Sequence, residues 1–365
     1  MEIVFYLLLG FNLIVFLIIL FNFLTAPKLY NKKINIKNEP FISVLIPARN
    51  EEENILACLD SVNNQNYKNY EIIVLDDNSS DNTYNLVKQI ELKNDKIKLI
   101  KGKPLPEGWK GKNWACNLLS KQAKGEYLLF MDADVKLMPN TLLYSIYLFN
   151  KFKLNVLSAF PTQITKSFGE RIIVPLMKWL LLSFLPLKLV YKYKNEKLIA
   201  ANGQFIMFKK EVYDYLGGHK SVKDNVVEDM EFALLTKRNN FKLMTTLGND
   251  AVFCKMYNSF SSAYWGFSKN YFQGFKMHWL PFLLLQLFFL FLFVSPFIIS
   301  LFNVNFLTIV FIILLGRVLL AINTKDNIIF SILMHIIQII VLALIAFNSV
   351  ISLKKNRILW KGRKV

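Results

Sequence analysis

Three long stretches without charged side chains constrain this sequence more than any other feature. Residues 3–27 form an uncharged run of 25, residues 279–316 a run of 38, and residues 327–353 a run of 27. A helix needs about 20 apolar residues to cross a membrane. The first and third runs each suffice for one crossing, and the second suffices for two helices that turn at Asn303-Val304-Asn305. We therefore expect an integral membrane protein.

Basic residues set the expected orientation of these helices. Lysines follow the first run at positions 28, 32, 33 and 37, and such residues favour the cytoplasmic side. The run lacks a basic leader and a small-residue cleavage site, which favours an uncleaved anchor over a signal peptide. The basic tail at 354–365 should also be cytoplasmic, but four crossings would place it outside. We expect one C-terminal apolar segment to be re-entrant or interfacial. Four crossings with an external tail are the alternative.

The region between the first two runs has the pattern of a soluble α/β domain. Strands are predicted at 41–46, 70–75, 97–100 and 126–131, and helices at 51–63 and 80–92. This alternation predicts a mostly parallel sheet, in which ligands bind beyond the carboxyl ends of the strands.

The expected domains follow from these patterns. They are a transmembrane anchor at 1–27, a cytoplasmic α/β domain at 38–270, transmembrane or re-entrant helices at 279–353 and the basic tail at 354–365. Residues 171–193 are apolar but interrupted by prolines and lysines, which suits an interfacial amphipathic segment. A buried core helix is an equal alternative for that segment.

Composition excludes several classes of protein. The net charge is +18, but much of the excess lies beside the apolar runs, where attraction to anionic lipid explains it without nucleic acid. The three cysteines, Cys58, Cys116 and Cys254, are widely spaced and lack paired histidines. Neither a disulfide-rich scaffold nor a zinc site is therefore expected. Both glycine-rich phosphate-binding fingerprints are missing from the sequence.

Polar clusters follow the first two predicted strands. In Pro47-Ala48-Arg49-Asn50-Glu51, we expect the proline to stop the strand and the polar residues to form the rim of a ligand site. Asn50 could instead simply cap the next helix. Asp76-Asp77 ends the second strand, where Asp77 could accept hydrogen bonds from a nucleotide base. An acidic turn without a ligand is the alternative there.

A third cluster, Asp132-Ala133-Asp134, follows the strand predicted at 126–131. Paired carboxylates at a strand end are hard oxygen ligands of the kind that Mg²⁺ or Mn²⁺ prefers, and the metal would also hold a diphosphate. The motif is short, but its place behind the other two clusters makes it more specific. The sequence thus predicts a metal site at Asp132 and Asp134.

The segment Leu105–Ala115 is a loop rich in glycine, lysine and tryptophan, with a helix expected only from Trp114 onward. Lys112 could contact a phosphate, and Trp109 could stack on a base or sugar. A surface loop anchored by tryptophans is the alternative.

Three acids, Glu228, Asp229 and Glu231, lie near a later helix start. Acids are favoured at helix N-termini in any case. One of them could instead be a general base that takes the proton of an acceptor hydroxyl.

In this order, the clusters resemble glycosyltransferase family 2, the inverting nucleotide-sugar enzymes with a GT-A fold, over roughly residues 41–280. The resemblance implies that Pro47–Glu51 contacts the nucleotide. It implies that Asp77, the second acid of Asp76-Asp77, faces the uracil of a UDP-sugar. Asp132-Ala133-Asp134 corresponds to the metal-binding D-x-D motif, with Asp132 also near the donor. Glu228-Asp229 corresponds to the later E-D motif, whose aspartate is the catalytic base.

Other segments are similar to membrane-bound members that glycosylate polyisoprenoid lipids, including carotenoid (diaponeurosporenoate) and hopanoid-associated glycosyltransferases. These segments are Gly108–Ala115, Gly217-Gly218-His219-Lys220 and Trp360-Lys361-Gly362-Arg363. The resemblance places Trp109, Gly203 and His219 on the acceptor side. Processive synthases carry Q-x-x-R-W ahead of their channel helices, whereas Gln273–Trp279 has lysine for arginine and a displaced tryptophan.

The expected activity is the transfer of one sugar from a UDP-sugar to a lipid acceptor at the cell membrane, with Mg²⁺ or Mn²⁺. Lys112 would bind the donor, and Asp229 and Glu228 would be catalytic, with Asp229 as the base. The alternatives are a processive polysaccharide synthase and a non-catalytic membrane protein with a degenerate nucleotide-sugar site. A lipid nucleotidyltransferase or phosphotransferase would need a triphosphate-binding loop that the sequence lacks.

Overall fold

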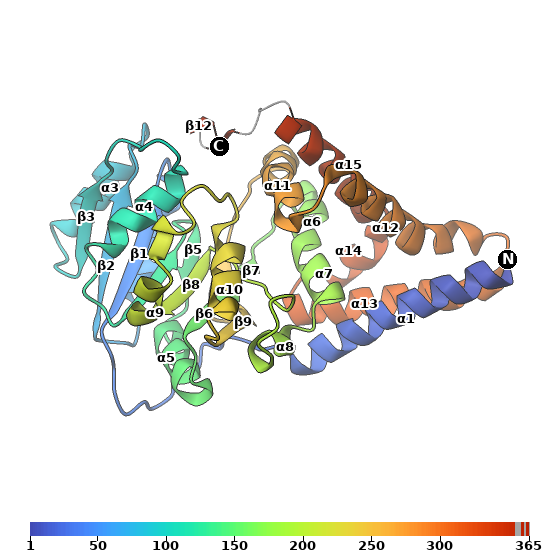
Figure 1. Ribbon diagram of the computed structural model, residues 1–365, viewed down its shortest axis with the longest axis horizontal. Coiled ribbons are helices and arrows are strands. Elements are labelled where there is room, and N and C mark those ends of the chain that lie inside the picture. The colour runs from blue at the N-terminus through green and yellow to red at the C-terminus, as the bar shows by residue number, and fades with distance from the viewer. Residues whose placement is uncertain (355–358, 361–362, 365) are drawn as a thin grey trace. The chain divides into compact units, whose positions relative to one another are not determined.

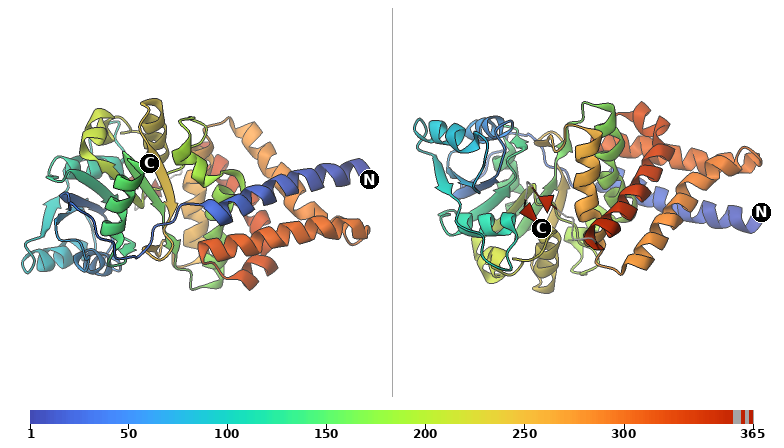
Figure 2. Two further views of the ribbon diagram at one scale, coloured as in Figure 1. Left: turned by 90° about the horizontal axis from the view of Figure 1, so that it is seen from below. Right: turned by 90° about the horizontal axis from the view of Figure 1, so that it is seen from above.

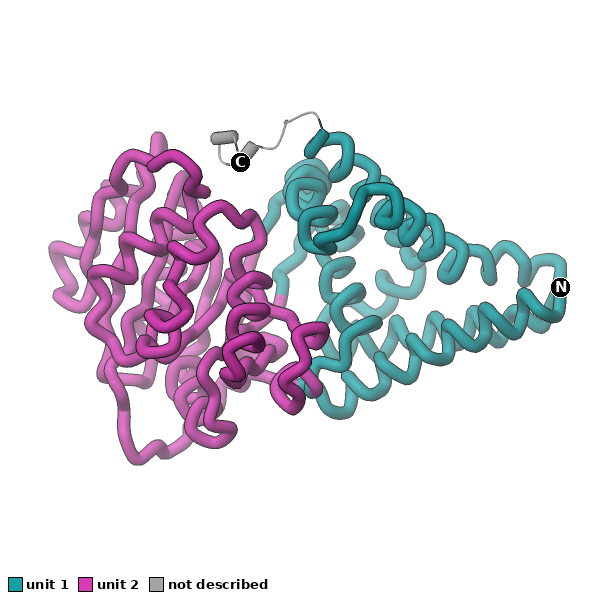
Figure 3. Tube along the Cα trace, in the orientation of Figure 1, with its two compact units in different colours: residues 1–26, 163–188, 256–364 teal, residues 27–162, 189–255, 365 magenta. Residues whose placement is uncertain are grey.

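The computed structural model describes residues 1–354, 359–360 and 363–364, and these divide into two units (Figure 3). Unit 1 consists of residues 1–26, 163–188 and 256–364, and unit 2 of residues 27–162 and 189–255. Short strands β11 (Leu359–Trp360) and β12 (Arg363–Lys364) pair with each other. Lys355, Arg357 and Lys361 of the predicted basic tail, and Gly362 of the terminal motif, lie outside the described residues.

A seven-stranded sheet forms the centre of unit 2 (Figure 1), with the order β3-β2-β1-β4-β8-β6-β9. All neighbouring strands are parallel except for the two pairs that β8 makes. The mostly parallel sheet predicted from the sequence is confirmed. In sheet order, the strands are Ile97–Lys101, Tyr70–Asp76, Ile42–Ala48, Tyr127–Met131, Phe205–Lys209, Val156–Phe160 and Leu243–Leu247.

The first strand does not stop at Pro47, which corrects the sequence prediction. β1 continues through Pro47, which is paired in register with Leu75 of β2. On its other side, β1 pairs with β4 only as far as Leu45. Proline has no N–H to donate, so it is tolerated where a neighbouring strand no longer needs that hydrogen bond. The polar residues of the first cluster therefore begin at Arg49.

Helices cover both faces of this sheet. Ile42, Val44 and Ile46 of β1 share a core with α2 (Ile55–Asn63), α3 (Thr83–Glu91) and α5 (Thr141–Phe152). Because side chains alternate along a strand, the residues between them face the opposite side. That side carries α4 (Gly111–Ser120), α9 (Lys210–Tyr215) and α10 (Glu228–Arg238). A small sheet of β5 (Val135–Leu137), β10 (Val252–Cys254) and β7 (Thr162–Gln163) completes the strands of the domain.

Three helix starts differ from the prediction. α2 begins at Ile55 and α3 at Thr83, because the preceding residues are held in turns by hydrogen bonds between the two loops. α4 begins at Gly111, three residues before the expected Trp114. The N–H of Lys110 is bonded to the Lys223 carbonyl, and the Lys110 carbonyl accepts the first helical hydrogen bond, from Trp114. These partners fix the start of α4.

Unit 1 contains the apolar helices. Four segments are long and apolar enough to cross a membrane by length and composition: α1 (Glu2–Thr25), α12 (Trp279–Ile299), the 3₁₀ turn and α13 at Val304–Thr324, and α15 (His335–Lys354). Asn303 caps the 3₁₀ turn η2 (Val304–Phe306) through its side chain, so the predicted turn between two helices is present. α13 itself covers Leu307–Thr324.

Helices α1 and α13 run in the same direction. Phe5 packs on Phe306, a Cβ on Gly316 would meet Ile19, and the Asn323 side chain donates to the Asn22 carbonyl. Figure 2 shows the two helices side by side in both views. Both helices therefore end at the same end of the bundle, and the loop after α12 lies at the opposite end.

The apolar run at 327–353 is not one helix, which corrects the prediction of a single long segment. It is broken at Met334 into α14 (Ile328–Leu333) and α15. His335 bonds to the Phe293 carbonyl in the middle of α12, whereas Lys354 lies over the Trp279 ring at the start of α12. α14 and α15 therefore form a hairpin that begins and finishes at the end of the bundle where α1 and α13 end.

The interrupted apolar segment forms three short helices, α6 (Phe168–Ile173), α7 (Pro175–Phe184) and α8 (Leu187–Lys192). Lys178 and Trp179 of α7 are both buried, and the Trp179 ring packs edge-on against Phe289 and Phe293 of α12. α11 (Phe260–Phe275) packs along α15. The side of α7 that carries Trp179 is thus part of the core of unit 1.

Candidate active site

Acidic and basic side chains meet beyond the carboxyl end of β4 in unit 2. Lys112 Nζ lies 2.8 Å from Asp132 Oδ1 and 3.2 Å from Glu228 Oε1. Lys112 comes from the first turn of α4, Asp132 directly follows β4, and Glu228 begins α10 together with Asp229. Three segments that are far apart in the sequence thus place their charges at one edge of the sheet, as expected for an α/β fold.

Gly203 is the backbone centre of this cluster. The antiparallel pairing of β8 with β4 brings the start of β8 next to Asp132. The Gly203 N–H donates to Asp229 Oδ2 at 2.8 Å, and its carbonyl accepts from Lys112 Nζ at 3.4 Å. A Cβ at this position would lie 3.0 Å from Glu228 Oε1 and 3.1 Å from Lys112 Nζ. A residue larger than glycine would therefore displace these two side chains.

The surroundings of Asp229 suit a proton acceptor near neutral pH. Its second oxygen, Oδ1, accepts from the Met230 N–H at 2.7 Å, so each carboxylate oxygen has a backbone donor. Burial and the neighbouring Glu228 carboxylate raise the pKa of Asp229 to about 7, against the opposing effects of these donors and of Lys112. A base whose pKa lies near the working pH is the most effective.

Lys112 remains charged in this cluster. Burial opposes its charge, but the carboxylates of Asp132 and Glu228 outweigh burial and raise the pKa of Lys112 well above its usual value. The ammonium thus holds together two acids that would otherwise repel each other. Lys112 lies in the first turn of α4, where the positive end of the helix dipole disfavours a second positive charge. The neighbouring carboxylates offset this repulsion.

Asp132 and Asp134 provide a donor set that fits a hard divalent cation. Both carboxylates follow β4, and the buried thiol of Cys254 donates to Asp134. Mg²⁺ and Mn²⁺ are commonly held by one or two protein carboxylates together with substrate phosphates. Groups of three or more metal-ligating side chains do not occur among the described residues, so the protein part of such a site would be these two acids.

The first two polar clusters are joined into one rim. The Arg49 guanidinium donates to the carbonyls of Asp77 and Asn78, and the Asn50 amide oxygen accepts from the Ser80 N–H at 2.8 Å. Asn50 does not cap α2, because Asn54 occupies the N-cap position. Glu51 donates its N–H to the Thr83 hydroxyl at 2.8 Å. The rim is therefore built by hydrogen bonds between the two loops.

The acidic pair of the second cluster is buried. Asp76 is 2% exposed and accepts from the Ser79 N–H at 3.2 Å, whereas Asp77 is 3% exposed. A Cβ on Gly102 would lie 3.3 Å from Asp77 Oδ1. Asp76 therefore stabilises the turn. Because Gly102 has no side chain, there is space next to the Asp77 carboxylate.

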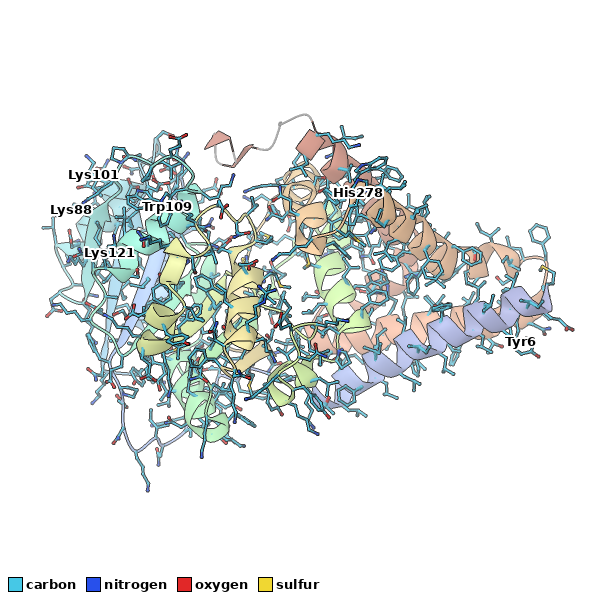
Figure 4. All side chains as sticks on the ribbon, viewed as in Figure 1. Tyr6, Lys88, Lys101, Trp109, Lys121 and His278 are labelled. Carbon is cyan, nitrogen blue, oxygen red and sulfur yellow. The ribbon has the colours of Figure 1, made fainter. Side chains whose placement is uncertain are left out.

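The tryptophan loop leads into α4. Trp109 is half-buried and packs edge-on against Trp114 at 5.0 Å, and Figure 4 labels it on unit 2. The Asn113 side chain is buried and donates to the carbonyls of Val222 and Asn225 at 2.7 and 2.9 Å. Asn113 thus fixes the loop that precedes α10 and its acids. The sequence prediction missed this residue, although it directly follows Lys112.

His219 does not line the charged cluster. It is 3% exposed, its Nδ1 lies 2.8 Å from the Tyr213 hydroxyl, and its ring packs against Phe130 and Phe232. Burial and the nearby Lys112 charge lower the pKa of His219 to about 3, so the ring is neutral. His219 therefore supports the turn behind the charged cluster, and its place on the acceptor side stays a prediction.

Comparison with known proteins relates this site to a family. The profile of Glycosyl transferase family 2 matches residues 43–217. A beta-monoglucosyldiacylglycerol synthase of Nostoc sp. is 33% identical over 129 residues, which are 35% of this chain and 27% of that protein. A 4,4'-diaponeurosporenoate glycosyltransferase of Staphylococcus haemolyticus is 26% identical over 245 residues, 66% of this chain and 64% of that protein. The matches thus span about a quarter to two thirds of these relatives.

A solved structure shares the fold. The mannosyltransferase PcManGT from Pyrobaculum calidifontis, in complex with GDP-Man and Mn²⁺, superposes with a TM-score of 0.57 at 14% identity and covers 96% of this chain and 98% of that one. At this identity, the likeness concerns the fold, which is the GT-A-like sheet with apolar helices before and after it. From the matched profile and the ordered motifs, the region of the chain at residues 43–217 belongs to glycosyltransferase family 2.

Proposed function

We propose that this protein transfers one sugar from a UDP-sugar to a lipid acceptor, with inversion at the anomeric carbon. The observation that carries the proposal is the junction of Lys112, Asp132, Glu228 and Asp229 around Gly203. A buried carboxylate with a pKa of about 7, beside a metal-ligating D-x-D motif, is the arrangement that such a transfer needs. The names of the two relatives described above refer to lipids, which supports a lipid acceptor.

Asp229 is the proposed base. In its charged form, the carboxylate takes the proton of the acceptor hydroxyl as the oxygen attacks the anomeric carbon from the face opposite the UDP. The bond to the UDP oxygen breaks, and UDP leaves. Since the Gly203 and Met230 N–H groups hold both oxygens of Asp229, the carboxylate keeps one orientation during the reaction. Glu228 raises the pKa of the base and is a positioning residue.

The donor side is formed by the remaining residues. Asp77 and the rim at Arg49–Glu51 would bind the uracil and ribose, and Lys112 would contact the diphosphate. Asp132 and Asp134 would hold Mg²⁺ or Mn²⁺, which offsets the charge that develops on the leaving diphosphate. The neighbour of similar fold is described with Mn²⁺ and a nucleotide sugar, which is consistent with this arrangement.

We also propose a membrane topology with α1, α12 and α13 as crossings and α14–α15 as a re-entrant hairpin. The lysines that follow α1 favour a cytoplasmic location for that end of the bundle. The hairpin begins and finishes at the same end as α1, so Lys354 would be cytoplasmic as well. This arrangement removes the conflict between four crossings and a basic tail, and unit 2 would face the cytoplasm.

The test uses membranes that contain the full chain. Radiolabelled UDP-glucose, UDP-N-acetylglucosamine and UDP-galactose are added separately with Mn²⁺, and label is counted after extraction with organic solvent. We expect one donor to label the organic phase, and Asp132→Asn/Asp134→Asn to abolish the labelling. Label in an aqueous polymer would instead indicate a processive synthase. Absence of label with every donor, together with absence of UDP binding, would refute the proposal.

A further inference from the structure

The helix bundle of unit 1 encloses a second group of charged side chains. Arg317 of α13 and Lys178 of α7 are each only 4% exposed. Lys178 Nζ lies 3.1 Å from Asp326 Oδ1, directly after α13. Two buried cations thus lie inside a group of apolar helices, and only Lys178 is paired with a carboxylate. Ionisable groups in such surroundings are costly and are commonly connected with a bound partner.

The hydrogen-bond partners of Arg317 are neutral. Its Nε donates to His335 Nδ1 at 2.9 Å, and Nη2 donates to the Gln338 side-chain oxygen. His335 Nδ1 accepts while Nε2 faces the Phe293 carbonyl at 3.0 Å, so the ring carries one proton and no charge. The Trp179 ring lies 5.5 Å from the guanidinium carbon. Among the described residues, no hydrogen bond engages Nη1 and no carboxylate is paired with Arg317.

A small cavity lies between the two cations. It is lined by Lys178, Trp179, Arg317, Thr324, Asp326 and Ser331, among others. Its free volume of about 10 Å³ is close to the least that holds one water molecule. The cavity therefore has room for one oxygen atom of an anion, with the remainder of the anion outside. An oxygen there would supply the negative charge that the two cations lack.

The surroundings of the cavity are apolar. Pro175, Trp179, Leu320 and Ala321 are among the residues that line it. Elsewhere on α13 and α14, Ile322, Ile329 and Leu333 are exposed, and the acyl or prenyl chain of a membrane lipid can contact these side chains. A soluble phosphate gains nothing from that contact.

We propose that Arg317 and Lys178 form a binding site for the phosphate head group of a membrane lipid. One phosphate oxygen enters the cavity and accepts hydrogen bonds from Arg317 Nη1 and Lys178 Nζ. Both donors are charged, and charge-assisted hydrogen bonds to phosphate are the stronger kind. The lipid chain lies along α13 and α14. The inference rests on unit 1 alone and does not depend on the proposed transferase activity.

The test is thermal unfolding of the purified full-length protein in dodecyl maltoside, with decyl phosphate as the lipid probe. Inorganic phosphate and the uncharged decyl glucoside are the comparison probes. We expect decyl phosphate to raise the unfolding temperature of the unaltered protein by several degrees. Arg317→Gln should abolish this rise. Lys325→Gln, which removes an exposed lysine next to Asp326, should leave the rise unchanged and is the matched control.

Two further variants keep the test decisive if Arg317→Gln does not fold. Arg317→Lys retains the positive charge but loses the planar guanidinium with its several N–H donors. Lys178→Gln/Asp326→Asn removes both charges of the ion pair, so that neither partner is left charged without the other. Each should reduce the rise caused by decyl phosphate. An equal rise in the unaltered protein and all these variants would overturn the proposal, as would an equal rise with decyl glucoside. An Arg317-dependent rise with inorganic phosphate alone would overturn the assignment to a lipid.

Discussion

The two units each bury a charged cluster, and the clusters have opposite excess charge. In unit 2, Asp132, Glu228 and Asp229 surround one cation, Lys112. In unit 1, Arg317 and Lys178 are both buried, and one carboxylate, Asp326, is paired with Lys178. An acidic excess suits a divalent cation and a proton, whereas a basic excess suits an oxyanion. We therefore expect the sign of the excess charge in each buried cluster to indicate the class of ligand that the cluster binds.

The supporting groups of the two clusters also differ. In unit 2, backbone N–H groups of Gly203 and Met230 hold the central carboxylate. In unit 1, neutral side chains of His335 and Gln338 hold the central guanidinium. Backbone groups allow little adjustment, which fits a base that must keep one geometry. The side-chain network connects α13 to α15 and therefore depends on how these helices pack.

The largest effect should come from the acidic cluster. We expect Asp229→Asn to reduce kcat by about 10²–10⁴-fold, since this is the usual contribution of a general base. UDP binding, measured by calorimetry, should be unchanged. Asp224→Asn alters an exposed acid in the loop before α10 and should retain full activity. Normal turnover of Asp229→Asn would show that the base lies elsewhere.

The basic cluster should respond mainly in stability. Lys178→Met leaves the Asp326 carboxylate buried without its cation, and the loss of one partner of a buried pair costs about 3–5 kcal/mol. Denaturant unfolding in detergent measures this change. The double variant Lys178→Met/Asp326→Asn should recover most of the loss, and Lys325→Met should have little effect. A double variant as unstable as Lys178→Met would argue against the ion pair.

A smaller effect is expected at Gly203. A methyl group there would press on Glu228 and Lys112, and a displacement of catalytic groups by about 1 Å can lower the rate by up to about 10²-fold. We expect Gly203→Ala to lower kcat by about 10- to 100-fold without unfolding unit 2. Gly274→Ala, where an added Cβ meets nothing within 4 Å, is the control. Equal activity of the two variants would remove Gly203 from the site.

The smallest effect is a shift of the pH profile. Only charged Asp229 accepts a proton, and its pKa is raised from 3.8 to about 7, so activity should rise with pH through that region. The positive charge of Lys112 lowers the pKa of Asp229. Lys112→Gln should therefore move the rising limb of kcat/KM to higher pH, in addition to the loss at every pH that follows from the missing diphosphate contact. Lys110→Gln should not move it.

The sequence predicted the motif positions better than their contacts. The clusters at Asp76, Asp132 and Glu228 are visible because polar residues interrupt apolar strand patterns or begin a helix. The role of Gly203 is not visible in this way, because it acts through its N–H, its carbonyl and a missing side chain. The partnership of Lys112 with both acids depends on how α4 and α10 lie at the end of β4, which residue spacing does not reveal.

The sequence predicted the apolar segments by composition, but it did not predict the break at Met334. Every residue from Asn327 to Leu353 is uncharged, so one long helix was the simplest expectation. The break follows from tertiary contacts, since His335 and Gln338 turn toward Arg317. Pro47 gives the converse case, in which a residue expected to stop a strand lies within it because one neighbouring strand has already ended.

The hairpin of α14 and α15 has a consequence for the order of assembly during synthesis. His335 and Gln338 find their partner in Arg317, which precedes them in the chain, and Gln338 also donates to the Arg171 carbonyl of α6. The hairpin therefore cannot satisfy its polar groups until α13 and α6 are in place. We expect it to dock last, as a late step that completes the bundle.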